Sequence, residues 1–448
     1  MSYFKLAFHI YESQSVEKLL FIQKIRRKRS VLRLGSIMFV RCAAAGTALL
    51  LSSSLICAPP RPSLFEWGNG RYQPRPGHPD DILNFSNFQV RQVATFSRDK
   101  APVVQTLAYG PTHTAVIDSK GDLYLSPLHH PNNVQLDDVN DSERVVALLQ
   151  AGGKYKQAAF TRRGVLFALN EKGEVWQWRF DKDPEAKPRQ IPTLKAVKQI
   201  ATGADHFAAI DSEGHLYTMG DDTFGQCGIH TFGRTAREPY FELRYPNPTR
   251  VESLKGRVKE VACGSHHTLA VLESGEVRGW GRNDKRQIGP TEETLNKMPL
   301  AAIFEPVPIL NLTTRRISKV AAGDSFSFFI SEDREVYGCG LNTRGQLGLG
   351  YLNHTIEFTP VPSLTGFVVR EGEAEREVGI KELKCGAEHC LALLDVGAVY
   401  SWGGNEYGEQ GNQRRVIADR PTLLKQFQGQ RVSSVFVGTR CSAILTSP

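Results

Sequence analysis

The strongest candidates for chemistry in this chain are a cysteine and two histidines that lie within five residues, Cys263, His266 and His267. Thiolate sulfur and imidazole nitrogen are ligands that zinc prefers, and a thiol beside an imidazole is also the arrangement of a nucleophile with its general base. The same residue types occur as packing residues at the ends of buried strands. The elements that position these side chains decide between the interpretations.

The stretch Val261–Gly281, VACGSHHTLAVLESGEVRGWG, is one copy of an internal repeat. In each clear copy a glycine is followed eleven residues later by a second glycine, and then by an aromatic or apolar residue with a glycine after it. The copies lie 41 to 63 residues apart, with first anchors at Gly110, Arg162, Gly203, Gly264, Gly323, Gly386 and Gly438. Seven copies at this spacing predict a β-propeller of seven four-stranded blades.

Each copy predicts two short strands of apolar alternation around a tight turn, as in HTLAVL and EVRGWG on either side of ESG. Glycine in that turn supplies a positive φ without a Cβ clash. A further glycine pair, eight residues apart, brackets a compact turn such as GDDTFGQCG at 220–228. The second copy has RFDKDPEAKPRQ at 179–190 in place of this turn.

The last copy stops after its first half, and the missing half is found as LFEWGNG at 64–70. Pairing of these N-terminal residues with the C-terminal strands would close the ring and remove exposed sheet edges. We therefore expect an all-β fold in which residues 64–448 form one seven-bladed β-propeller, closed by a composite blade from both chain ends.

The repeat favours a structural role for the cysteine and the histidines. The place of Cys263 is taken in the other copies by Tyr109, Thr161, Thr202, Ala322, Cys385 and Val437. The place of His267 is taken by His113, His206 and His389, and in the remaining copies by Val165, Phe326 and Cys441. Histidines that recur once per blade are too far apart to bind one metal. We expect no catalytic residue, cofactor or metal, with His267 bonded to a neighbouring backbone group and His266 exposed in a loop.

The positive charge of the chain is concentrated in one segment. Of the formal net charge of +8, residues 1–60 contribute +7 through nine Lys and Arg and two Glu, which leaves +1 for the other 388 residues. The near-neutral body argues against nucleic acid as a partner of the propeller. The eight cysteines are too sparse for a disulfide scaffold, and no CxxC, HExxH or phosphate-loop motif occurs.

The N-terminal segment has the pattern of a targeting sequence or a membrane anchor. Residues 1–41 include KIRRKRSVLRLGSIMFVR at 24–41, a basic, acid-free stretch typical of a mitochondrial presequence. Residues 42–58 are uncharged, and at about 1.5 Å per residue they would span roughly 26 Å, the short end of a transmembrane helix. We expect a mitochondrial protein held in the inner membrane by 42–58, with its body facing the intermembrane space.

Three alternatives stay open for this segment. A wholly cleaved presequence would give a soluble matrix protein. Translation from Met38 would make the following residues a secretory signal, with glycan expected at Asn311 or Asn353. A basic tail of a nuclear protein is the third.

Three copies of the repeat, at 261–289, 320–350 and 383–411, resemble the regulator of chromosome condensation repeat in their glycine spacing and in the pairs Trp280-Gly281 and Trp402-Gly403. That family forms seven-bladed propellers closed by a shared blade, and the resemblance covers about 64–448. Its founding member is a nuclear exchange factor for a small GTPase. Its relatives include scaffolds, ubiquitin-ligase modules and mitochondrial members. Together with the N-terminal segment, the resemblance implies the mitochondrial branch and a task in assembly of respiratory complex III or of the mitoribosome.

We therefore expect a non-enzymatic scaffold that binds protein partners through long loops on one rim, at 230–250, 290–316 and 351–378. Aromatic residues mixed with arginine are typical of interface hot spots. The first loop carries such a set: Phe232, Arg234, Tyr240, Phe241, Arg244 and Tyr245. The alternative is a guanine-nucleotide exchange factor for a small GTPase, which needs only a loop that displaces the Mg²⁺ and phosphate contacts of its partner.

Overall fold

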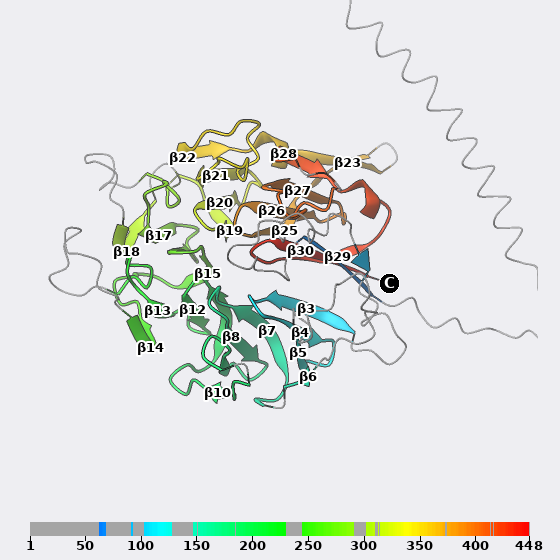
Figure 1. The fold of residues 1–448 in the computed structure, drawn as a ribbon. Helices are drawn as coiled ribbons and strands as arrows, with labels where there is room; N and C mark the ends of the chain where they lie inside the picture. The colour runs from blue at the N-terminus through cyan, green and yellow to red at the C-terminus, as the bar shows by residue number, and fades with distance from the viewer. Residues whose placement is uncertain are drawn as a thin grey trace, which may run out of the picture. The chain divides into compact units, whose positions relative to one another are not determined.

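In the computed structural model, seven four-stranded antiparallel sheets are arranged as blades around one axis (Figure 1). The predicted all-β, seven-bladed propeller is confirmed. The predicted presequence and transmembrane segment lie outside the described residues and stay predictions. The structure describes residues 62–68, 91–92, 103–127, 147–149, 151–183, 185–229, 244–290, 302–309, 312, 314–371, 374–412, 414 and 416–447.

The blades are numbered here in chain order, and each runs from an innermost first strand to an outermost fourth strand. Blades 1 and 2 comprise β3 (Val104–Tyr109), β4 (His113–Asp118), β5 (Leu123–Pro127) and β6 (Ala147–Leu148), then β7 (Tyr155–Phe160), β8 (Val165–Asn170), β9 (Val175–Arg179) and β10 (Arg189–Gln190). Blades 3 and 4 comprise β11 (Val197–Thr202), β12 (His206–Asp211), β13 (Leu216–Asp221) and β14 (Arg244–Arg250), then β15 (Val258–Cys263), β16 (His267–Leu272), β17 (Val277–Arg282) and β18 (Ala302–Pro308). Blades 5 and 6 comprise β19 (Ile317–Ala322), β20 (Phe326–Ser331), β21 (Val336–Gly340) and β22 (Thr355–Pro360), then β25 (Ile380–Cys385), β26 (His389–Leu394), β27 (Val399–Gly403) and β28 (Ala418–Leu423).

Blade 7 is the predicted composite of the two chain ends. Its strands are β29 (Val432–Val437), β30 (Cys441–Thr446), β1 (Ser63–Gly68) and β2 (Arg91–Gln92). The N-terminal β1 pairs antiparallel with the C-terminal β30, so that Trp67 lies opposite Ser442. Each innermost strand also contacts the innermost strands of both neighbouring blades, which closes the ring (Figure 1).

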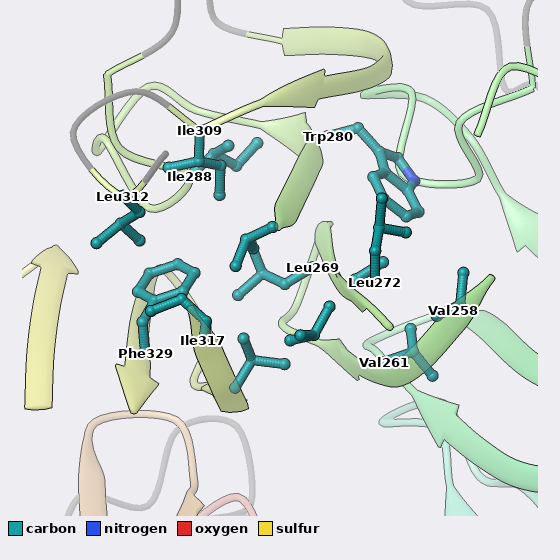
Figure 2. Packing of buried hydrophobic residues seen from close by; sticks show 14 of the residues in the cluster. Val258, Val261, Leu269, Leu272, Trp280, Ile288, Ile309, Leu312, Ile317 and Phe329 are labelled. Atoms are coloured by element: carbon teal, nitrogen blue, oxygen red, sulfur yellow. The ribbon is translucent and has the colours of Figure 1, made fainter. Parts of the chain in front are cut away.

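The second strand is buried along its whole length in every blade except blade 1, where His113 is half-buried, although the sequence predicted alternation. All six residues of β16 are buried, because blades pack on both faces of this strand. Trp280 of β17 and Leu269 of β16 belong to a core that reaches into the next blade, where Phe329 of β20 packs (Figure 2). This continuous packing from blade to blade makes the ring a rigid frame.

The hairpin turn between second and third strands has the predicted backbone geometry. Gly275 adopts a φ of +83°, in the left-handed region that favours glycine. Arg334 takes the same place in blade 5 and adopts a φ of +65° in spite of its Cβ. The turn therefore keeps its shape even where the repeat lost its glycine.

The long loops of the sequence differ from the prediction, because each contains the fourth strand of its blade, β14, β18 or β22. The third also contains the 3-10 turn η3 (Pro362–Leu364) and a two-stranded hairpin, β23 (Phe367–Glu371) and β24 (Ala374–Val378). A second 3-10 turn, η4 (Lys425–Phe427), precedes β29. Among the described residues, no helix has the length and apolar character needed to cross a bilayer.

The turn after the first strand of blade 2 is one residue longer than its counterparts. Phe160 ends β7 and four residues precede Val165, whereas three residues separate β15 from β16. The residue equivalent to Cys263 in blade 2 is therefore Phe160 and not Thr161, as the eleven-residue interval had indicated.

Candidate functional site

The cysteine and histidines of Val261–Gly281 have separate neighbours. The Cys263 thiol lies beside the hydroxyl of Thr268, and burial raises the pKa of this thiol to about 12, so it is protonated at neutral pH. The His266 ring is half-buried with its edge against Phe224, at 5.3 Å between ring centroids, where the sequence predicted exposure. In the part of the chain that the structure describes, no group of three or more His, Cys, Asp or Glu could hold a metal ion.

His267 is one of three buried histidines that link neighbouring blades. In each case Nε2 lies at hydrogen-bond distance from a hydroxyl on the second strand of the next blade: His206 to Thr268 at 3.0 Å, His267 to Ser327 at 3.0 Å and His389 to Ser442 at 2.9 Å. Each hydroxyl donates its proton to a backbone carbonyl, of Gln226, Gln287 or Glu409 respectively. The hydroxyl therefore accepts from the imidazole, which places the histidine proton on Nε2. The predicted backbone partner was wrong, although the structural role is the predicted one.

Burial keeps these histidines neutral. It lowers the pKa of His206 and His267 to about 3 and that of His389 to about 4. The Gly-x-x-His spacing has a steric cause, because a Cβ on Gly264 would overlap the ring of His267. A neutral, enclosed imidazole of this kind is a packing and hydrogen-bonding element.

Compact turns after the third strands of blades 3 to 6 fill the gap to the next blade. In blade 3, Asp222 accepts from the backbone N–H of Cys227 at 2.7 Å, and Gln226 accepts from that of Phe224 at 2.8 Å. The carbonyl of Gln226 then accepts from the indole of Trp280 in blade 4 at 3.0 Å. The equivalent pairs that hold the other three turns are Asn283 with Gln287, Asn342 with Gln346, and Asn405 with Glu409.

Blade 2 lacks this turn, and blade 3 lacks the residues that would bind it. Phe207 takes the place that Thr268 has in blade 4, and Met219 takes the place of Trp280. Neither side chain donates a hydrogen bond. The space between blades 2 and 3 remains open as a pocket with a volume of about 580 Å³.

The pocket combines an apolar floor with a cationic rim. The floor is formed by Val165, Phe167, Phe207 and Met219, and the rings of Phe167 and Phe207 stack with centroids 4.2 Å apart. The cations that line the pocket are Arg163, Arg179, Lys182, Lys187, Arg189 and Arg244. Against these six stand two acidic residues, Asp181 and Asp205.

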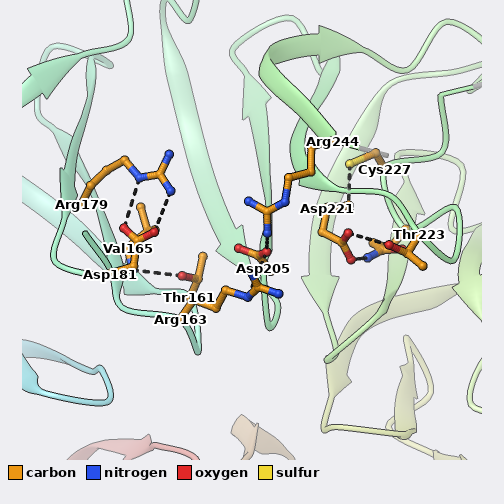
Figure 3. A network of polar contacts seen from close by, with 11 residues as sticks. Thr161, Arg163, Val165, Arg179, Asp181, Asp205, Asp221, Thr223, Cys227 and Arg244 are labelled. Atoms are coloured by element: carbon orange, nitrogen blue, oxygen red, sulfur yellow. Dashed lines mark hydrogen bonds and ion pairs between the residues drawn. The ribbon is translucent and has the colours of Figure 1, made fainter. Parts of the chain in front are cut away.

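The two carboxylates form ion pairs with arginines near the floor. Arg179 donates to both oxygens of Asp181, at 3.1 and 2.6 Å. Arg163, at 3.2 Å, and Arg244 contact the same oxygen of Asp205 from different blades (Figure 3). Burial, together with the proximity of Arg163 and Arg179, lowers the pKa of Arg244.

Two of the six predicted partner-binding residues lie in this pocket. Arg244 and Tyr245 begin β14 and line its wall. Phe232, Arg234, Tyr240 and Phe241 lie outside the described residues, and for them the prediction is untested. The other rim cations were not predicted; all of them except Arg163 lie in 179–190, where the replacement of the compact turn was the available sequence signal.

A second cavity, of about 640 Å³, follows the axis of the ring and is lined by the innermost strands. Arg162 of blade 2 and Asp324 of blade 5 form an ion pair and are among the residues that line it. Polar side chains of the innermost strands bind the backbone of the next blade, as where Gln157 both donates to and accepts from Ile200, at 2.7 and 3.0 Å. These contacts give the axial cavity a structural role.

Comparison with known proteins agrees with this architecture. Residues 63–448 match the model of the RCC1-like domain. The chain is 31% identical to the human E3 ubiquitin-protein ligase HERC2 over 305 residues, which cover 67% of this chain and 6% of HERC2. It is 30% identical to the ultraviolet-B receptor UVR8 of Arabidopsis thaliana over 318 residues, 69% of this chain and 65% of UVR8. The chain thus spans less than two thirds of either relative.

Solved structures show the same fold at lower identity. Prp20p of Saccharomyces cerevisiae is 21% identical with a TM-score of 0.63, over 86% of this chain and 92% of Prp20p. Human WBSCR16 is 17% identical with a TM-score of 0.65, over 86% of this chain and 99% of WBSCR16. With the closed ring, the composite blade and the match over 63–448 together, the chain belongs to the family of proteins with an RCC1-like domain.

Proposed function

We propose that this chain is a non-enzymatic scaffold that binds a protein partner on the propeller face that carries the pocket between blades 2 and 3. The open pocket is the observation that supports this most directly. The compact turns seal the four following gaps between blades by hydrogen bonds, whereas this gap presents an apolar floor and an excess of cations. Rigid frames that present such a site on one face are suited to docking rather than to turnover.

Site-specific photo-crosslinking in cells tests this proposal. A photoreactive phenylalanine analogue at Lys182 on the pocket rim is expected to give a discrete adduct with a partner protein. The same analogue at Lys255, which lies between β14 and β15 on the opposite face, is the matched control. Equal adducts at both places, or none at Lys182, would contradict binding on this face.

We place the scaffold in mitochondria, anchored in the inner membrane by residues 42–58, with a role in biogenesis of respiratory complex III or of the mitoribosome. The support is the basic stretch at 24–41 followed by an uncharged stretch. Tagged chains with and without residues 1–60 test the compartment, and carbonate extraction tests the anchor. Import that does not depend on residues 1–60 would contradict this placement, and a glycan at Asn311 would indicate the secretory alternative.

Exchange of guanine nucleotide on a small GTPase is the second candidate function. Prp20p, which shares the fold, binds Gsp1p and histones. An exchange assay with the crosslinked partner distinguishes the two functions, because a scaffold leaves the rate of nucleotide release unchanged. Acceleration of release by the full-length chain would favour the exchange factor.

A further inference from the structure

We propose that the pocket between blades 2 and 3 receives an acidic segment of the partner polypeptide that also carries a bulky apolar side chain. This inference rests on the proposed scaffold function and adds the chemistry of its partner. The pocket exists because two changes coincide: blade 2 has no compact turn, and blade 3 has Phe207 and Met219 where blade 4 has the donors Thr268 and Trp280. Its volume, about 580 Å³, is in the usual range for ligand-binding pockets.

The charge of the rim favours an anionic occupant. Six cationic and two acidic side chains line the pocket, an excess of four positive charges. Asp181 is bound by Arg179, and Asp205 is shared between Arg163 and Arg244. Of the described residues, none forms an ion pair with the remaining rim cations, Lys182, Lys187 and Arg189. An arriving carboxylate would therefore meet cations that form no ion pair with the described residues, and it would relieve their mutual repulsion.

The floor favours a polypeptide over a nucleic acid. Phe167 and Phe207 stack on each other and are buried, so they offer no open ring face on which a base could stack. These two rings close the floor from below, and Met219 and Val165, 8% and 5% exposed, provide the hydrophobic wall that an aromatic or aliphatic side chain can reach. A sugar–phosphate backbone would use the rim and leave this wall unpaired, whereas an acidic peptide with a bulky apolar residue would use both.

Fluorescence anisotropy with defined peptides tests the proposal on the full-length chain. The probe is a fluorescein-labelled peptide, Glu-Glu-Asp-Phe-Glu-Glu-Leu-Glu-Glu, and the comparison peptide has Ser at both apolar places. The pocket variant is Lys187→Glu with Arg189→Glu, which reverses two exposed cations on the rim. The matched control is Lys255→Glu with Arg257→Glu, which makes the same charge change with the same spacing on the opposite face.

We expect the probe to bind the wild type with a Kd below about 100 µM at low salt. The pocket variant should weaken binding by about tenfold or more, the control variant by less than about twofold, and loss of the apolar side chains by about tenfold. No binding of the probe, or equal losses in both variants, would overturn the pocket assignment. The assignment would also be overturned if a uridine oligonucleotide bound the wild type with higher affinity than the probe and did not bind the pocket variant. Failure of the probe alongside a partner crosslinked at Lys182 would leave the scaffold function standing and refute only this partner chemistry.

Discussion

The gap between blades 3 and 4 and the gap between blades 2 and 3 have the same strand framework and different contents. In the first, the carbonyl of Gln226 accepts from both Thr268 and Trp280, so a turn of one blade is bound to the core of the next. In the second, no turn enters, and Phe207 and Met219 close the floor by apolar packing alone. The ring therefore needs its strands at every gap but the hydrogen-bonded turn at only some of them.

The two gaps also differ in what a ligand would meet. Where the turn is present, its backbone carbonyl already accepts from the hydroxyl and the indole of the next blade, and a partner would find little to bind. Where it is absent, the rim cations lack sufficient counter-charge. A repeat copy that lacks the compact turn can therefore present a binding site while the ring keeps its strands.

Replacement of Trp280 by Ala should produce the largest effect and break the sealed gap. The indole is fully buried and donates to Gln226, so we expect a loss of about 3–5 kcal/mol in the free energy of unfolding. Met219→Ala at the open gap should cost only about 1–2 kcal/mol, because its side chain already borders empty space. Denaturant titration of both variants measures the difference, and equal losses would contradict the distinction between the gaps.

Glu409→Gln should remove a pH-dependent loss of stability at the sealed gap between blades 6 and 7. Burial raises the pKa of Glu409 to about 7 from its ordinary value near 4.5. The stability that depends on its protonated form is complete below pH 4.5 and is lost as the pH rises through 7. At pH 8 the variant should therefore be more stable than the wild type by about 3 kcal/mol, and at pH 4.5 by little.

Thermal unfolding between pH 4.5 and 8 checks the effect of Glu409. Gln287→Glu is the reciprocal control, because Gln287 has the equivalent place and accepts from the backbone N–H of Lys285 as Glu409 accepts from that of Tyr407. It should lose stability over the same pH range. A pH-independent difference between Glu409→Gln and the wild type would refute the assignment.

His267→Phe should remove part of the acid sensitivity of the sealed gaps. With a folded-state pKa of about 3, below its ordinary value near 6.5, the imidazole takes up a proton only on unfolding as the pH falls from 6.5 toward 3. Stability conferred by the neutral histidine is thus present above pH 6.5 and lost below it. Relative to pH 8, the wild type should lose about 2 kcal/mol more than the variant by pH 5.

Phenylalanine is the matched replacement for His267 because Phe326 has the same place in blade 5, with Gly323 beneath it. Ser327 still donates to Gln287 in the variant, so the free energy of unfolding at pH 8 should change by less than about 1 kcal/mol. Urea titrations at pH 8 and pH 5 test both numbers. A large loss at pH 8 would show that the imidazole itself holds the blades together.

The sequence predicted what the repeat period controls and missed what depends on packing between copies. Glycine spacing predicted the number of blades and the closure of β1 on β30, because those glycines are required by local backbone geometry and close approach. It did not predict the hydroxyl partner of His267, which comes from the next blade. It marked the missing turn at 179–190 but not the pocket, because the pocket also requires the loss of donors in blade 3.

Charge reversal of Lys187 and Arg189 should have the smallest effect on stability and is therefore the cleanest way to separate frame from site. Both side chains are exposed, and Arg189 belongs to a two-residue outer strand. Exposed substitutions of this kind change the free energy of unfolding by less than about 0.5 kcal/mol, and relief of repulsion from the other rim cations should make the change slightly favourable at low salt. Differential scanning fluorimetry at two salt concentrations measures this, with Lys255→Glu and Arg257→Glu as control, where one hydrogen bond to Ser212 is lost. A loss above about 2 kcal/mol in the free energy of unfolding of the pocket variant would show that these cations hold blade 2 in place. The pocket charges would then stabilise the fold, which would argue against a docking site.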